Sequence, residues 1–226
     1  MSVLRIAWVI ARKDLLIEAR SRELAYTTLF FAVACLLVFA FALVREGAAP
    51  ADAPAGILWV AVVFSGTLAL GRTFERERQS ETLRALLLSP AERASVYYGK
   101  LLALVLLMIG VEAVLVPVVG LIFAAPIGRA PWLLAGLLAS GTIGFAAVGT
   151  LFAAMLVRAR SRDVLLPVVL YPIAVPVVIA GVRGTAAVFA IEPDYAGAHT
   201  WLAMLILFDA VFLTLASWTF APVMSE

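Results

Sequence analysis

Residues 72–100 read RTFERERQSETLRALLLSPAERASVYYGK, and this charged stretch separates two long apolar runs. Six charged side chains lie between Arg72 and Glu81, and Arg84 follows just beyond them. Each Arg, Lys or Asp near the centre of a membrane helix costs about 2.5–3.5 kcal/mol. The stretch must therefore lie in water or at a membrane surface.

The same stretch has the pattern of a surface helix followed by a new helix start. Glu75 and Arg78 are three residues apart, so they pair on one helical face, and leucines form a short apolar stripe on the next turns. Residues 89–92, Ser-Pro-Ala-Glu, form a capping box with proline at the first helical position. We predict a helix at 72–88 that offers a docking surface to a soluble partner, and a second helix that starts at Ser89 and enters the membrane.

The composition places the chain among integral membrane proteins. Of its 226 residues 64% are hydrophobic and only 14% are charged, and the mean hydropathy is +1.07, whereas soluble domains carry about 25% charged residues. Apolar runs of about 17–25 residues are long enough to span a bilayer as helices. We predict a single all-α membrane domain over residues 1–226, with spans at about 24–44, 54–71, 99–125, 131–157, 163–182 and 200–223.

The distribution of Lys and Arg predicts the orientation in the membrane. Fourteen of these residues lie in the N-terminal segment, in 72–100 and in 158–162, whereas the loops on the other side carry only three. Because basic residues are retained on the cytoplasmic side, we expect both termini and the 72–88 helix in the cytoplasm.

Residues 1–23 precede the first span and have an amphipathic pattern. Leu4, Trp8, Ala11 and Leu15 recur with helical spacing, and the basic residues Arg5, Arg12 and Lys13 lie at other positions. We interpret this segment as a helix lying in the cytoplasmic membrane interface; a solvated basic tail is the alternative.

Two acidic residues, Glu112 and Asp209, lie inside predicted spans. An acid within the membrane is a candidate functional group by default. The alternative for each is a structural hydrogen bond to Ser or Thr on a neighbouring helix.

Three further features predict a helix contact, the position of a tryptophan and the structure of an outer loop. Gly136, Ser140 and Gly144 follow one another at four-residue spacing, which favours close approach of a second helix. Trp59 suits the outer membrane interface. Residues 183–199 predict a short re-entrant or interfacial helix in the longest outer loop.

The chain lacks the residue patterns of several enzyme classes. It has no G-x-x-x-x-G-K-[ST] phosphate loop, so ATP is not bound by that route. His199 is its sole histidine: it could ligate a haem iron axially, or it is simply interfacial. No metal-ligand cluster and no nucleophile–base pair is evident. We expect no enzymatic activity, no directly bound cofactor and no nucleic-acid partner.

The sequence FERERQSETLRALLLSPAERASVYYGKLLA at 74–103 resembles the signature of ABC-2-type permeases, E-x-E, then T-L-x-x-L-L-x-[ST]-P, then G-K-L. In that superfamily the segment is a coupling helix that inserts into a cleft of a separate ATPase subunit. The resemblance implies charged contacts to the ATPase by Glu75, Glu77, Arg78 and Glu81, and anchoring of the helix by Leu83, Leu86 and Leu87.

Within that superfamily the chain most resembles the CcmB family, haem exporter protein B of cytochrome c maturation. The resemblance rests on GILWVA from Gly56, LALGRTFE at 68–75, LLLSP at 86–90 and LPVVLYPIAVP from Leu166. It implies a permease subunit of the bacterial inner membrane that assembles with an ATPase, CcmA, and with CcmC and CcmD.

The same resemblance implies that ATP hydrolysis on the partner drives haem delivery to a periplasmic chaperone, or release of the loaded chaperone. Haem is then the cargo of the complex and ATP binds to the partner. The complex is expected to contain two permease copies, or one permease with a related subunit. Two other functions fit the residues: an ABC-2 exporter of a drug, lipid or polysaccharide, and a membrane scaffold without transport.

Overall fold

The computed structural model describes residues 3–43, 50, 52–73, 93–157, 159 and 161–223. Within these ranges the chain forms seven α-helices and no strand. Their bounds are α1 (Val3–Ser21), α2 (Glu23–Leu43), α3 (Ala53–Arg72), α6 (Arg93–Phe123), α7 (Pro131–Met155), α8 (Arg162–Phe189) and α9 (Tyr195–Val223).

All helices except α1 are long and apolar enough to cross a membrane, which gives six spans in the described part of the chain. The prediction of an all-α, multi-pass membrane protein with six spans is confirmed. Of the predicted coupling helix, only Arg72 and Thr73 lie within the described residues; the rest of 72–88 and the capping box at 89–92 lie outside them.

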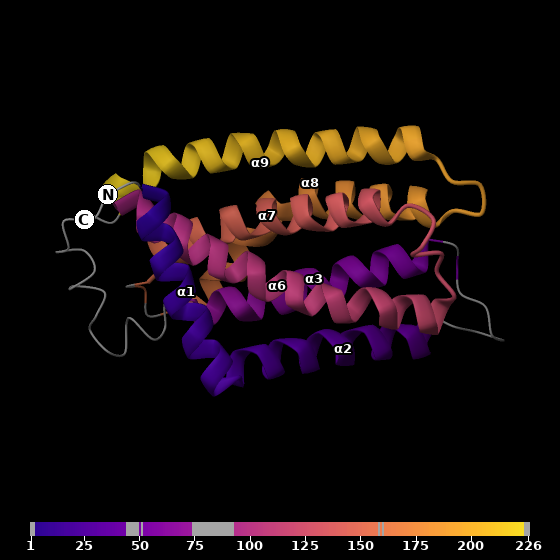
Figure 1. Cartoon of the computed structure of the whole chain (residues 1–226), viewed down its shortest axis with the longest axis horizontal. Helices are drawn as coiled ribbons and strands as arrows, with labels where there is room; N and C mark the ends of the chain where they lie inside the picture. Colours follow the sequence, from indigo (N-terminus) through magenta and orange to yellow (C-terminus); the bar gives the residue numbers. More distant parts are fainter. Residues whose placement is uncertain are drawn as a thin grey trace.

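The six spans run side by side, and α1 crosses one end of the bundle (Figure 1). In that view α9 and α2 form the two outer edges, and α3, α6, α7 and α8 lie between them. The last turn of α3, the start of α6 and the end of α9 lie at the same end as α1, which we call the α1 end. The connections between α6 and α7 and between α8 and α9 lie at the opposite end.

The chain turns sharply between α1 and α2 at a residue with left-handed backbone geometry. Arg22 has φ of 56°, a conformation that commonly ends helices but usually at glycine. Its N–H donates to the Glu18 carbonyl at 2.6 Å, and the Glu18 carboxylate accepts from the Ala25 N–H at 2.8 Å. Glu18 therefore satisfies backbone donors on both sides of the turn.

Helix α1 has two apolar faces rather than one. Ala7, Ile10 and Ala11 are buried, mainly against α6, whereas Leu4 is 76% exposed and Trp8 is 53% exposed. The predicted helix is present, but Ala11 does not share the exposed face of Leu4 and Trp8. That exposed face is the one available to a membrane interface, which stays a prediction.

The α1–α6 contact depends on the absence of a side chain at Gly99. A Cβ there would lie 2.7 Å from the Ile10 Cβ and 2.9 Å from the Ala7 carbonyl oxygen. We predict that Gly99→Ala destabilises the protein by about 1–2 kcal/mol through overpacking, because the backbone of α1 must move. Thermal unfolding of the purified protein measures this. Gly110→Ala on the same helix meets no atom within 4 Å, so an equal loss in both variants would contradict the prediction.

Trp59 lies in the protein core and not at the outer interface as predicted. It is fully buried, next to Gly141 of α7 and Gly181 of α8, and its indole N–H donates to the Thr185 hydroxyl at 2.9 Å. The prediction was wrong because two glycines and a hydroxyl on other helices provide the space and the hydrogen-bond acceptor that a buried indole needs.

Helix α8 continues without interruption through Pro167, Pro172 and Pro176 and ends only at Phe189. The re-entrant or interfacial helix predicted within 183–199 is therefore absent: its apolar residues are the last turns of α8. They remain helical because Thr185 and Val188 are buried against the rest of the bundle.

Candidate functional site

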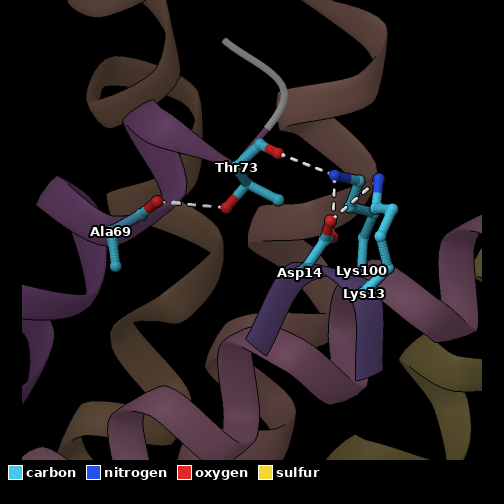
Figure 2. Close-up of polar contacts among 5 residues, drawn as sticks. All are labelled: Lys13, Asp14, Ala69, Thr73 and Lys100. Atoms are coloured by element: carbon cyan, nitrogen blue, oxygen red, sulfur yellow. Dashed lines mark hydrogen bonds and ion pairs between the residues drawn. The ribbon is translucent and has the colours of Figure 1, made fainter. Parts of the chain in front are cut away.

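A buried lysine joins three helices at the α1 end. The Lys100 side chain is only 3% exposed, and its Nζ lies 2.9 Å from Oδ2 of Asp14, on α1. The same Nζ donates a hydrogen bond to the carbonyl oxygen of Thr73, which directly follows α3, at 3.2 Å. Figure 2 shows this arrangement, with Asp14 and the end of α3 on either side of the ammonium group.

The end of α3 is held by further contacts. The Thr73 N–H donates to the Leu70 carbonyl at 3.1 Å and its hydroxyl donates to the Ala69 carbonyl at 3.0 Å. Arg162, at the start of α8 and 3% exposed, donates to the Leu70 carbonyl at 3.2 Å. Cations favour the negative end of a helix dipole, so Lys100 and Arg162 stabilise this terminus from two neighbouring helices.

Asp14 also contacts a second, more exposed lysine. Lys13 Nζ lies 3.0 Å from Asp14 Oδ1, and its side chain is 45% exposed (Figure 2). Water screens exposed ion pairs, which typically contribute less than about 1 kcal/mol. The Lys100 contact is therefore the stronger determinant of where α1 sits.

The two intramembrane acids each have a hydroxyl partner on α7. Thr142 donates to Oε1 of Glu112, and Ser140 donates to Oδ2 of Asp209 at 2.7 Å. Glu112 is 4% exposed and Asp209 is 8% exposed. The predicted hydrogen bond to Ser or Thr on a neighbouring helix is present for both acids, and a transport role for either acid stays a prediction.

The small-residue stripe on α7 is the surface against which α9 packs. A Cβ at Gly144 would lie 2.5 Å from Asp209 Oδ1, and one at Gly136 would lie 3.4 Å from Leu202. Ser140, between these glycines, makes the hydrogen bond to Asp209. The stripe thus allows close approach, as its spacing predicts.

Removing either hydroxyl tests how strongly the acids depend on it. We predict that Thr142→Val and Ser140→Ala each destabilise the protein by about 1 kcal/mol, the usual range for hydrogen bonds between membrane helices. Thermal unfolding measures both. Thr214→Val is the matched control, because its exposed hydroxyl bonds only to the carbonyl of Ala210 within its own helix. A loss in the control as large as in Thr142→Val would contradict the prediction.

Of the remaining predicted site residues, only His199 lies in the described part of the chain. His199 is exposed in the first turns of α9, and the described residues contain no group of three or more His, Cys, Asp or Glu side chains that could hold a metal ion. Outside those residues lie the predicted ATPase contacts Glu75, Glu77, Arg78, Glu81, Leu83, Leu86 and Leu87.

Sequence reasoning missed the contact between Asp14 and Lys100. Lys100 belongs to the G-K-L element of the ABC-2 signature, and Asp14 is the one acid next to the basic pair Arg12 and Lys13. Both features are visible in the sequence, but nothing in it shows that α1 folds back onto α6 to bring them together.

Comparison with known proteins assigns the chain to a family. The model of a family described as "CcmB protein" matches residues 5–225. A protein of Paracoccus denitrificans named "Heme exporter protein B" is 32% identical over 192 residues, which cover 85% of this chain and 84% of that protein. A protein of Pseudomonas aeruginosa with the same name is 30% identical over 214 residues, covering 94% and 93%. This six-span membrane protein therefore belongs to the CcmB family.

Proposed function

We propose that this chain is the permease subunit of an ABC transporter for cytochrome c maturation, in the bacterial inner membrane with both termini in the cytoplasm. The similarity to two proteins named "Heme exporter protein B" over most of the chain supports the haem system. The excess of Lys and Arg at the α1 end supports this orientation.

The observation that carries a coupling role is the anchoring of both flanks of residues 74–92. Before this segment, the end of α3 is held by Lys100 and Arg162; after it, α6 is packed against α1. A segment whose flanks are fixed to several spans can pass a force from an ATPase into the bundle as a rigid-body change.

In this proposal the chain itself performs no hydrolysis. A CcmA-like ATPase binds ATP and contacts residues 72–88, and CcmC- and CcmD-like subunits complete the complex. The cycle either exports haem or releases a haem-loaded chaperone in the periplasm.

Loss of the gene is expected to abolish covalent c-type cytochromes, measured by haem staining of cell proteins, and the intact gene is expected to restore them. The double reversal Glu77→Arg with Arg78→Glu is expected to restore none and to lose the co-purifying ATPase, because both charges are proposed to face it. Glu192→Arg, an exposed acid in the connection between α8 and α9, is the control and should restore staining.

Two results would contradict parts of this proposal. Normal c-type cytochromes in the deletion strain would exclude the haem assignment and favour export of a drug, lipid or polysaccharide. Full cytochromes and normal ATPase co-purification in the double reversal would exclude the docking assignment. If the chain is instead a membrane scaffold without transport, ATP is expected never to change the packing of the spans.

A further inference from the structure

Lys100 occupies a position where an ammonium group is costly. Removing a charge from water costs several kcal/mol in real proteins, and replacing a buried ion pair by apolar residues is often neutral or stabilising. Stability alone therefore does not account for a lysine that is 3% exposed and bonded to Asp14 on one side and to Thr73 on the other.

Its three-way contact joins elements that are far apart in the sequence. Asp14 belongs to α1, Thr73 follows the last residue of α3, and Lys100 lies in the second turn of α6. The adjacent Gly99 is the point where α6 comes within contact distance of Ile10 and of the Ala7 backbone. The ammonium group thus sits at a close contact of α1 with the bundle, and a shift of either helix changes its geometry.

We propose that Lys100 is a positioning residue of the transport cycle, which links α1 to the junction of α3 and α6 so that the three move as one unit. This inference rests on the proposed function, in which force enters the bundle at that junction. Movement of the end of α3 would pull the Thr73 carbonyl and, through Lys100, the carboxylate of Asp14. Helix α1 would follow, together with its exposed Leu4 and Trp8.

The decisive variant removes both charges of the buried pair; Lys13 loses its contact with Asp14, but its side chain is 45% exposed and stays in water. Asp14→Leu with Lys100→Met is expected to accumulate at the wild-type amount, because apolar side chains replace a buried ion pair. It is expected to yield c-type cytochromes about fivefold below wild type, since coupling through packed elements is lost while folding is kept. Lys100→Arg, which retains the charge, should give most of the wild-type staining, and so should Lys13→Met, which removes a charge from the same cluster at an exposed position.

A merely structural ion pair predicts a different pattern. The double variant would then restore both protein amount and cytochromes, and that result would overturn the proposal. If the double variant does not accumulate, Asp14→Asn provides the test, because the amide fills the same space while the charge attraction that holds Lys100 is lost. Wild-type cytochromes at a wild-type amount of this variant would also overturn the proposal, whereas reduced cytochromes at that amount support it.

A second measurement does not depend on haem. A fluorescent label at Leu4→Cys, in a Cys35→Ala background, reports the surroundings of α1. The Glu77→Arg, Arg78→Glu reversal is expected to shift its emission when Lys100 and Asp14 are present, and not in the Asp14→Leu, Lys100→Met variant. An equal shift in both would overturn the linkage. If the deletion strain keeps its c-type cytochromes, the haem assignment fails while this measurement still decides the linkage.

Discussion

Gly141→Ala is expected to destabilise the protein by about 3 kcal/mol, at the upper end of the usual cost of overpacking a core. A Cβ at this position would lie 2.7 Å from Cζ3 of Trp59 and closer still to Cη2. Trp59 cannot easily move away, because it also lies against Gly181 of α8, where a Cβ would lie 2.5 Å from Cζ2. Its indole is also held by the hydrogen bond to Thr185.

The unfolding temperature of the purified protein in detergent measures this effect. Gly136→Ala is the matched control on the same helix, since a Cβ there makes only ordinary contact, at 3.4 Å, with Leu202. Combining Gly141→Ala with Trp59→Leu should recover part of the loss, because residues in contact give non-additive effects. Additive losses in that double variant would show that Trp59 is not the obstacle.

Gly144→Ala is expected to cost about 2 kcal/mol, through overpacking together with the disturbance of a buried hydrogen bond. The added methyl would lie 2.5 Å from Oδ1 of Asp209 and 3.1 Å from Cδ1 of Phe208. Asp209 would have to move away from α7, which lengthens its hydrogen bond from Ser140. The α7–α9 contact would weaken as a result.

Cross-linking across the α7–α9 contact measures this separation. Cysteines at Gly136 and Leu202, placed in a Cys35→Ala background, are expected to cross-link less efficiently when Gly144 is alanine. Gly110→Ala, on α6 and with no atom within 4 Å of the added Cβ, should leave the cross-link unchanged. Unchanged cross-linking in the Gly144→Ala variant would contradict the prediction.

Individual residues explain why some of the packing could be predicted. The stripe of Gly136, Ser140 and Gly144 identifies a contact surface because small residues at four-residue spacing lie on one face of a helix. The helix that packs against this stripe could not be identified from the sequence, since the residues of α7 do not indicate that Asp209 of α9 lies opposite Ser140. For Glu112 the sequence left two roles open, and the structure supplies the hydroxyl of Thr142 as its hydrogen-bond donor.

Trp59 illustrates the opposite case. Taken alone, a tryptophan near the end of a span fits a membrane interface, and only the arrangement of α7 and α8 reveals the space left by Gly141 and Gly181. The turn at Arg22 is similar. No glycine in the sequence indicates it, and it is the hydrogen bonds accepted by Glu18 that stabilise it.

The sequence by itself determined the fold class, the number of spans and the family resemblance, because apolar length and charge are properties of each segment alone. The tertiary structure decided which side chains meet: Lys100 with Asp14 and Thr73, Asp209 with Ser140, and Trp59 with its two glycines. Such contacts join residues far apart in the chain, and they depend on the rotation and register of whole helices. Those are set by the packing of the complete bundle and not by any local pattern.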